Sequence, residues 1–344
     1  MTETKTVAVI GTGAGGLSAA AHLAKRGFEV IGFERNPWLG GLMAPFERDG
    51  YEFAPGVHYL GQLEPDQGFG GEFMELGIDP RELFAKMDDD FDRFRFPGFE
   101  IAMCSNIERY RERLVEAFPS DVRGVDRVIG AIEHLQKAQK LQTPGKHAIR
   151  EYFDALGAFS LVRWMKSTFG EYLDWACESS RLKSVFAAQC GDNGLPPSRA
   201  SAAMGLAVLT HYSNGAWFPK GGSGSMVEAL AGVAKTHGAE FELSTTIARI
   251  TVSGGRADGV IAEDGRRWDV DAVVGAVDPR HIYGEMLDSE YVPEAIAERL
   301  PGIESSISAC SLYLGIGRDL REDGWGAQNT WHYSAWDLDE VYQP

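Results

Sequence analysis

The first 34 residues carry a pattern of apolar and polar positions that predicts a strand, a helix and a second strand. Residues 6–10 are a short, mostly apolar run typical of a buried strand, and residues 29–33 are read as a second strand. Between them, residues 17–26 are rich in alanine with apolar residues at helical spacing, and Gly27 follows as a helix C-cap would. The pattern indicates a β-α-β unit.

The pattern changes after this unit. Phe46, Tyr51 and Phe53 flank Asp49-Gly50, a dipeptide that favours the tight turn of a β-hairpin. Residues 65–201 are expected to be mainly helices with loops.

The second half of the chain predicts a further helix and a sheet. A loop marked by Gly and Pro precedes a helix expected over residues 225–236. Residues 241–277 alternate as in a β-meander, with turns at Gly254-Gly255 and Asp264-Gly265. Residues 271–277 are nearly all apolar, so this last strand is expected to be buried on both faces.

The composition excludes several classes of protein. The chain has 344 residues, 44% of them hydrophobic, so it can bury a substantial core. Its 33 Lys and Arg against 50 Asp and Glu give a net charge of −17, which disfavours nucleic acid as a partner. Its 4 cysteines form no C-x-x-C pair, so neither a metal site nor a disulfide framework is expected. With no apolar run near the ~20 residues of a membrane span, and a polar start in place of a secretory signal, a cytoplasmic protein is expected.

Residues 11–16, Gly-Thr-Gly-Ala-Gly-Gly, fit the G-x-G-x-x-G fingerprint of dinucleotide-binding proteins. The string alone is weak evidence in a chain with 41 glycines, but a strand precedes it, a helix follows it, and Glu34 ends the second strand. Gly11 permits the tight turn, Gly13 lets a pyrophosphate approach the backbone, and Gly16 lets the helix pack on the strand. Glu34 is expected to accept hydrogen bonds from the adenosine ribose hydroxyls.

The residues after Glu34 indicate which dinucleotide fits. A nicotinamide domain usually continues into further β-α units, whereas Gly40-Gly41 and a hairpin follow here, as in flavoproteins. Arg35 is compatible with a 2′-phosphate, but the carboxylate of Glu34 would repel that group. FAD is therefore the expected cofactor, and the alternative is a glycine turn that binds nothing.

Three segments resemble the phytoene desaturase superfamily of FAD-dependent oxidoreductases. The first runs from Trp38 to Gly61 and ends in Gly-Val-His-Tyr-Leu-Gly, which is most similar to the retinol saturase and carotenoid isomerase branch. The others are residues 191–222 and 245–279. The resemblance implies an α/β fold, with a Rossmann-like FAD-binding domain interleaved with a largely helical or mixed substrate domain. The expected bounds are residues 1–64 with 202–284 for the FAD domain, and 65–201 with 285–344 for the substrate domain.

The resemblance also implies site residues for the cofactor, with Ile247 where the backbone of the family usually meets adenine. The full set is Gly11, Gly13, Ala14, Gly16, Glu34, Arg35, Gly41, Leu42 and Ile247. Leu42 is a departure, because the family often has arginine there to help hold the pyrophosphate. Family members are also usually much longer, so the chain is expected to be a C-terminally truncated fragment.

The implied chemistry is saturation, desaturation or cis–trans isomerisation of the double bonds of a carotenoid or retinoid. FAD would carry the hydride, with NAD(P) or a quinone as a transient electron partner. His58 and His211 are the candidate catalytic residues, and Lys220 is a candidate contact to phosphate or flavin. The alternative for all three is structural: a backbone hydrogen bond, helix-end packing or a solvated loop. Asp88–Asp90 and Asp92 form an acidic patch for which a solvated face is favoured over a cation site.

Residues 134–168 are positively charged in a chain that is negatively charged overall, because they contain six Lys and Arg and two Asp and Glu. Aromatic residues lie among the later charged residues of the segment. Such a segment can lie on an anionic bilayer, so a peripheral membrane contact is one interpretation. The other is a core helix with a solvated cationic edge. Oligomeric state is not readable from the sequence.

Three competing functions stay open at this point. A flavin amine oxidase shares the two-domain plan, and a nicotinamide dehydrogenase shares the fingerprint at residues 11–16. The third is a truncated flavoprotein without independent activity.

Overall fold

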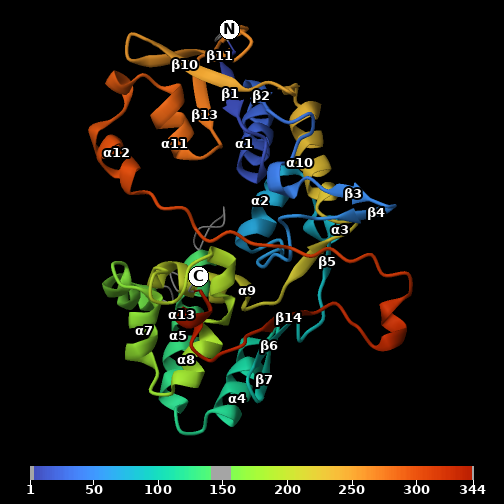
Figure 1. Ribbon diagram of the computed structural model, residues 1–344, viewed down its shortest axis with the longest axis vertical. Helices are drawn as coiled ribbons and strands as arrows, with labels where there is room; N and C mark the ends of the chain where they lie inside the picture. Colours follow the sequence, from blue (N-terminus) through green and yellow to red (C-terminus); the bar gives the residue numbers. More distant parts are fainter. Residues whose placement is uncertain (1–3, 141–155, 343–344) are drawn as a thin grey trace. The chain divides into compact units, whose positions relative to one another are not determined.

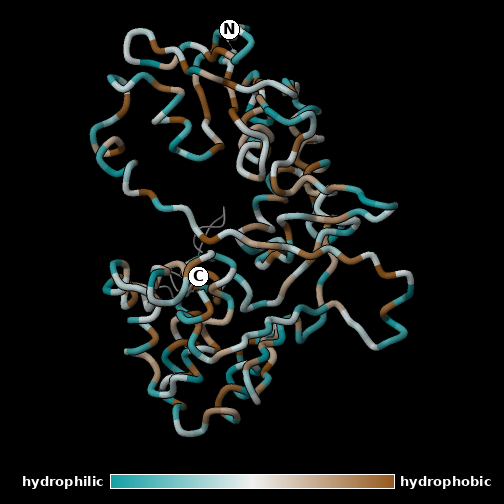
Figure 2. The backbone as a smooth tube through the Cα atoms, viewed as in Figure 1, coloured by the Kyte–Doolittle hydropathy of each residue, from teal (hydrophilic) through white to brown (hydrophobic). Residues whose placement is uncertain are grey.

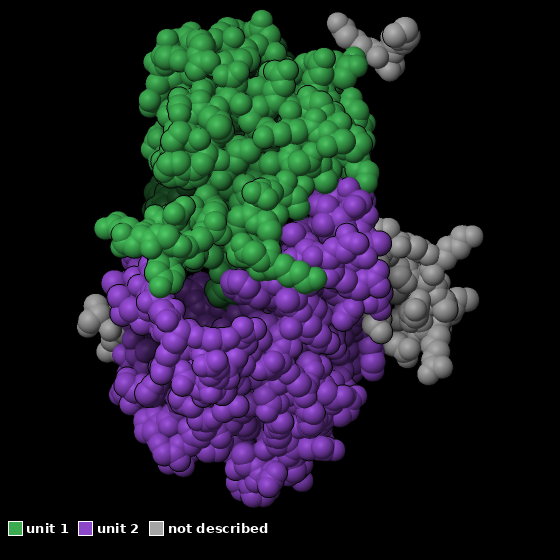
Figure 3. Space-filling view, turned by 90° about the vertical axis from the view of Figure 1, so that its right-hand side faces the viewer, with its two compact units in different colours: residues 1–58, 219–305 green, residues 59–218, 306–344 purple. Residues whose placement is uncertain are grey.

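The computed structural model describes residues 4–140 and 156–342, which form the helices and strands labelled in Figure 1. The chain divides into two compact units (Figure 3). Unit 1 comprises residues 1–58 and 219–305, and unit 2 comprises residues 59–218 and 306–344. Each unit is therefore built from two separate stretches of sequence.

Unit 1 is organised around a parallel sheet of four strands with the order β13-β1-β2-β9. Helix α1 connects β1 to β2 and packs against α10. The predicted β-α-β unit is confirmed, although α1 begins three residues earlier than expected because Gly13 provides its N-cap. The bounds of these elements are β1 Thr6–Ile10, α1 Ala14–Lys25, β2 Glu29–Phe33, α10 Gly224–Thr236, β9 Glu240–Glu242 and β13 Ala272–Gly275.

Strand β13 is more exposed than its apolar sequence predicts. It lies at the edge of the sheet and pairs with β1 alone among the described strands. Val273 and Val274 are partly exposed, and Ala272 and Gly275 are exposed. The prediction of a strand buried on both faces is therefore wrong, because an apolar sequence does not reveal whether a strand has two neighbours or one.

The remaining strands of unit 1 form two antiparallel groups that confirm the predicted turns. The hairpin of β3 (Phe46–Arg48) and β4 (Tyr51–Phe53) turns through Asp49 and Gly50, both with positive φ, as a tight hairpin turn requires. Its tip is hydrophilic, whereas apolar residues run along the central strands (Figure 2). The meander consists of β10 (Ile247–Ser253), β11 (Arg256–Ala262) and β12 (Arg267–Asp269). Short helices follow: α11 Pro279–His281, a π-helical turn Ile282–Met286 and α12 Glu294–Arg299.

Unit 2 is mostly helical, as predicted. Its main helices are α2 Gly68–Leu76, α3 Pro80–Leu83, α4 Ile107–Ala117, α5 Val122–Lys140, α7 Phe169–Ala176, α8 Ser180–Phe186, α9 Ala202–Tyr212 and α13 Leu338–Val341, with 3-10 helices η2 Leu156–Trp164 and η3 Ala188–Asn193. Large aromatic side chains such as Tyr110, Tyr172 and Phe169 are fully buried between them. Within the described ranges, no helix is long and apolar enough to span a membrane.

Unit 2 also contains strands that the sequence pattern did not predict. β6 (Asp92–Phe96) pairs with β7 (Phe99–Met103) through a turn at Pro97-Gly98, and with β14 (Asn329–His332) in parallel. A two-stranded sheet joins β5 (Phe84–Lys86) to β8 (Trp217–Pro219). The expectation of mainly helices with loops over residues 65–201 left out the strands at residues 84–103, where apolar and polar residues alternate around a Pro-Gly turn.

Candidate functional site

The turn between β1 and α1 brings backbone atoms closer together than side chains would allow. Gly11 has a φ of +90°, and its N–H donates to the Phe33 carbonyl at 2.9 Å. A Cβ on Gly11 would lie 2.6 Å from Cγ1 of Val277, and a Cβ on Gly16 would lie 1.9 Å from the Gly11 carbonyl oxygen. Both positions therefore require glycine, one for the turn and one for the close packing of α1 on β1.

Gly13 has a different reason to be glycine. It caps α1 with ordinary extended backbone, and a Cβ placed on it would meet no atom within 4 Å. The open space lies at the N-terminus of α1, where Ala14 and its neighbours have N–H groups without helical acceptors. Free N–H groups and the positive end of the helix dipole suit a phosphate, so the structure offers the opening that a pyrophosphate needs.

Glu34 holds the turn from the other side and is only 5% exposed. Its Oε2 accepts hydrogen bonds from the N–H of Thr12 at 3.1 Å and from its Oγ1 at 2.6 Å. Its Oε1 accepts from the N–H and the Nδ2 of Asn36, both at 3.0 Å. Since a carboxylate has about four acceptor sites, a ribose hydroxyl that binds Glu34 must share or replace one of these donors. The sequence predicted the ribose contact but missed this role within the protein.

The Gly40-Gly41 pair packs against the same turn. The N–H of Gly40 donates to the Thr12 carbonyl at 3.0 Å, and a Cβ on Gly41 would lie 3.0 Å from Cα of Gly13. Leu42, the next residue, is 78% exposed and does not line the cavity described below. The exposed Arg35 does line it.

Gly11, Gly13, Glu34, Arg35 and Gly41 line one side of a cavity of about 600 Å³ that lies wholly within unit 1. Of the other predicted cofactor residues, Ala14 and Gly16 do not line it. The other side includes residues 245–248, with the buried Ile247 at the start of β10, and the segment after β13. In that segment Nδ1 of His281 lies 2.8 Å from Oε2 of Glu285. Four carboxylates and a single arginine line the cavity, which disfavours a ligand with an additional phosphate near Arg35. The carboxylates are Glu34, Glu263, Asp278 and Glu285.

The two candidate catalytic histidines lie in different units. His58 is exposed at the end of the first stretch of unit 1. His211 lies near the end of α9 in unit 2, and its Nε2 accepts a hydrogen bond from the N–H of Gly61 at 2.8 Å. That nitrogen therefore carries no proton in this arrangement, which fits the structural alternative. Lys220 is exposed.

The acidic patch is not a uniformly solvated face. Asp89 pairs with Arg109 and accepts a hydrogen bond from Ser105, and Asp90 pairs with Arg113 at 2.7 Å. Asp92 is 0% exposed, so the expectation of a solvated face is wrong for this residue. The reason is that β6 begins at Asp92 and carries it into the interior of unit 2.

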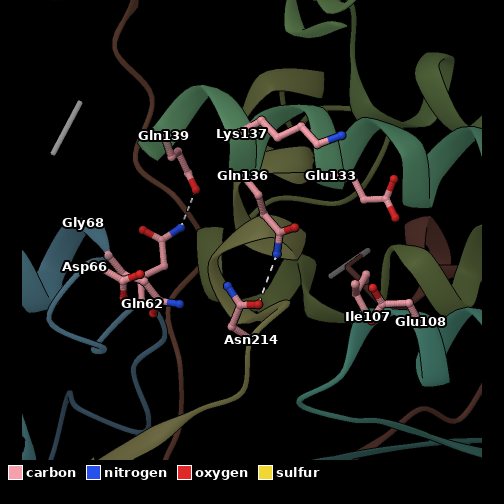
Figure 4. Close-up of a pocket in the computed structure, with 11 residues that line it drawn as sticks. Gln62, Asp66, Gly68, Ile107, Glu108, Glu133, Gln136, Lys137, Gln139 and Asn214 are labelled. Atoms are coloured by element: carbon pink, nitrogen blue, oxygen red, sulfur yellow. Dashed lines mark hydrogen bonds between the residues drawn. The ribbon is translucent and has the colours of Figure 1, made fainter. Parts of the chain in front are cut away.

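Unit 2 contains a cavity of about 470 Å³ with a polar lining (Figure 4). Nε2 of Gln62 donates to Oε1 of Gln139 at 2.8 Å. Nε2 of Gln136 donates to Oγ of Ser213 at 2.6 Å and to Oδ1 of Asn214 at 3.3 Å. The lining suits hydrogen-bonding groups rather than a hydrocarbon chain. It also includes Asp66, Gln67, Gly68, Ile107, Glu108, Glu133 and Lys137.

The class of protein that this fold and cavity define is a dinucleotide-binding α/β protein. Residues 14–334 match the family described as flavin containing amine oxidoreductase, and the chain belongs to this family. The glycine turn, the open space at Gly13 and the acid at the end of β2 fit the cofactor of such a family, and the cofactor is FAD.

The chain is similar to curated proteins with two kinds of name. It is 30% identical over 338 residues to a phytoene desaturase of Cercospora nicotianae, covering 92% of this chain and 52% of the relative. It is 25% identical over 360 residues to an all-trans-retinol 13,14-reductase of Danio rerio, covering 97% of this chain and 58% of the relative. The zeta-carotene-forming phytoene desaturase of Myxococcus xanthus is 27% identical, with 93% and 62% covered. The chain thus spans between about half and two thirds of the length of these relatives.

Solved structures support the fold. An oxidoreductase from Methanosarcina mazei matches with a TM-score of 0.60 at 20% identity, covering 86% of this chain and 64% of that one. Putrescine oxidase bound to putrescine matches with a TM-score of 0.57 at 16% identity, with 83% and 61% covered. These likenesses confirm the predicted fold class.

Proposed function

We propose that the chain is an FAD-dependent oxidoreductase that acts on the conjugated double bonds of a hydrophobic polyene. The observation that carries the proposal is the similarity to phytoene desaturases and retinol reductases over more than nine tenths of the chain, combined with a cavity suited to FAD. Saturation, desaturation and isomerisation are the candidate reactions. The electron partner would be NAD(P) or a quinone.

The residues of the chain would bind and orient the cofactor. Gly13 and the N-terminus of α1 would receive the pyrophosphate, Glu34 would keep the turn in shape, and residues near Ile247 would meet the adenine. FAD, when bound, supplies hydride transfer, so the chain needs no nucleophile of its own.

The first test is flavin loading followed by anaerobic mixing. The purified chain is incubated with FAD, and the absorbance of the bound oxidised flavin is recorded. Phytoene or all-trans-retinol is then added without oxygen, and loss of the oxidised-flavin absorbance indicates desaturation of the added polyene. Reoxidation of a chemically reduced sample by a polyene indicates saturation, and a change of polyene geometry without net flavin oxidation indicates isomerisation.

The same assay separates the competing functions. A flavin amine oxidase would lose the oxidised-flavin absorbance on addition of putrescine, and its absorbance would not change on addition of either polyene. A chain that cannot be loaded with FAD would support a flavoprotein without independent activity. Gly13→Ala, whose Cβ meets no atom within 4 Å, serves as a control that weakens FAD binding with little change in stability.

A peripheral membrane contact is a second element of the proposal. In η2 and the residues after it, Phe159, Val162 and Met165 are 71%, 60% and 62% exposed, with Arg163 and Lys166 beside them in sequence. The middle of the predicted segment, residues 141–155, lies outside the described residues. The expected result is co-sedimentation with anionic vesicles at low salt, reduced in Phe159→Ser/Met165→Ser but not in Met204→Ser, a control at another exposed methionine. Equal sedimentation of both variants would refute the contact.

A further inference from the structure

Unit 2 encloses an acidic residue in a network of uncharged polar groups. Asp92 is 0% exposed, and its Oδ2 accepts hydrogen bonds from the Tyr59 hydroxyl at 2.6 Å and from Nε2 of Gln189 at 2.8 Å. Among the residues that the structure describes, its other oxygen, Oδ1, has no hydrogen-bond partner, and neither has Oε1 of Gln189, a residue that is 2% exposed. The hydrogen-bonded pair of Asp92 and Gln189 therefore contains two buried acceptor atoms, Oδ1 and Oε1, to which no described group donates.

A single proton would complete this pair. A carboxylic acid and a carboxamide can form a closed ring, in which the amide N–H donates to one carboxyl oxygen and the carboxyl O–H donates to the amide oxygen. The first of these bonds is present between Gln189 and Asp92. A proton on Oδ1 would supply the second bond, and both acceptors that lack a donor would then be satisfied.

We propose that Asp92 and Gln189 form a buried proton-binding pair, in which Asp92 carries a proton on Oδ1 and donates it to Oε1 of Gln189. The neutral pair joins β6 to η3 and holds the Tyr59 hydroxyl. It thereby anchors the segment that follows His58, one of the two candidate catalytic residues. The proposal does not rest on the proposed function, because it concerns the chain without cofactor.

The surroundings favour the neutral form. Among the described residues, Tyr59 and Asp192 are the ionisable groups that act on the Asp92 carboxyl, and neither supplies a positive charge. The Asp92 carboxyl in turn acts on the hydroxyls of Tyr110, Tyr212 and Tyr333. Burial raises the pKa of Asp92 to about 6, although donors from Tyr59, Gln189 and Trp331 lower it. Burial also raises the pKa of Asp192 to about 6.

Two nearby groups are rival donors for an ionised Asp92. The indole of Trp331 lowers the pKa of Asp92 but forms no hydrogen bond with Oδ1. Asn329 is the register partner of Asp92 on β14, and its Nδ2 also lacks a partner within residues 4–140 and 156–342. If either group donated a hydrogen bond to an ionised Oδ1, then in Asp92→Asn its N–H would face the NH₂ group of the new side chain. Two donors would then face each other, and the substitution would be destabilising.

Asp92→Asn is therefore the decisive variant. An asparagine keeps one acceptor for Tyr59 and Gln189 and places an N–H donor where the proposal has O–H, so it imitates the proton-bearing state. The pKa of Asp92 is raised in the folded protein, so the wild-type chain loses this stabilisation as pH rises through about 6. From a folded-state pKa of about 6 and an ordinary value of 3.8, the folding equilibrium constant should fall roughly tenfold between pH 5 and pH 8.

The measurement is urea unfolding of the cofactor-free chain at pH 5 and pH 8. Between pH 5 and pH 8, the folding equilibrium constant of Asp92→Asn should not show the roughly tenfold fall assigned to Asp92. Asp192→Asn should still show that fall. The proposal would be overturned if Asp92→Asn were less stable than the wild-type chain at both pH values and kept the wild-type dependence of stability on pH. Asp92 would then be ionised in the folded chain.

A second measurement covers the case in which Asp92→Asn does not fold. Infrared difference spectra of Asp192→Asn between pH 6 and pH 8, where carboxyls with ordinary pKa values are almost fully ionised, should contain a protonated-carboxyl band. Absence of this band would refute the pair.

Discussion

Replacing Glu34 by glutamine tests whether this residue serves the protein or only the cofactor. The carboxylate accepts four hydrogen bonds, two from Thr12 and two from Asn36, and it is buried. Glutamine has a single acceptor oxygen, and its NH₂ group cannot accept, so about two of the four donors lose their acceptor. The turn that carries Gly11 and Gly13 should therefore loosen even when no cofactor is bound.

The magnitude follows from these bonds. A buried donor left without a partner costs about 1–3 kcal/mol, and hydrogen bonds to a charged group are worth about 1.5–3 kcal/mol each. Because the Thr12 hydroxyl and the Asn36 side chain can turn to other partners, we count mainly one backbone N–H and the loss of charge. Glu34→Gln should lower the free energy of unfolding of the cofactor-free protein by roughly 2–4 kcal/mol.

The assay compares two readouts on the same variant. Urea unfolding and amide hydrogen exchange at Thr12 and Asn36 are measured without FAD, and FAD affinity is measured by quenching of flavin fluorescence. We expect faster exchange and lower stability together with weaker FAD binding. If FAD binding alone weakened, with stability and exchange unchanged, the carboxylate would act only on the cofactor and our account of the turn would be wrong.

Four further substitutions probe the glycine contacts of both units and the exposed position after Gly41. Gly13→Ala should lower the free energy of unfolding by no more than about 1 kcal/mol, because alanine is a poorer N-cap than glycine, while FAD binding falls at least tenfold. Gly16→Ala should cost about 3 kcal/mol or more in urea unfolding. Gly61→Ala, whose Cβ would lie 2.0 Å from the His211 carbonyl oxygen, should destabilise unit 2 by a similar amount, and a fully stable variant would contradict this packing. Leu42→Arg should change unfolding by no more than about 0.5 kcal/mol, and a salt-sensitive gain of about fivefold in FAD affinity would place the side chain near the pyrophosphate.

Most of unit 1 could be predicted because its signals are local. The bounds of β1 and β2 follow from short apolar runs, and the hairpin at Asp49-Gly50 follows from the positive φ that both residues adopt. The glycines at positions 11 and 13 line the cavity that we propose for the cofactor. The exposure of β13 could not be predicted, since it depends on the number of neighbouring strands.

The interior of unit 2 was harder to predict. The hairpin of β6 and β7 has a local signal in the sequence, the alternation of apolar and polar residues around Pro97-Gly98. The burial of Asp92 has no such signal, because its partners Tyr59 and Gln189 lie 33 and 97 positions away. Similarly, the bond from Gly61 to His211 spans 150 positions, so the sequence could not indicate that this imidazole accepts from the backbone.

The interleaving of the two units has a consequence for synthesis on the ribosome. β2 ends at Phe33 and β13 begins at Ala272, so 272 − 33 = 239 residues separate the completion of β2 from the arrival of the second neighbour of β1. At about 5–20 residues per second this takes roughly 12–48 s, during which β1 has an open edge. β6 likewise has one open edge until its parallel neighbour β14, which begins only at Asn329, has been synthesised. Each unit thus needs a strand made late in translation, and we expect the nascent chain to depend on chaperones that shield these edges until then.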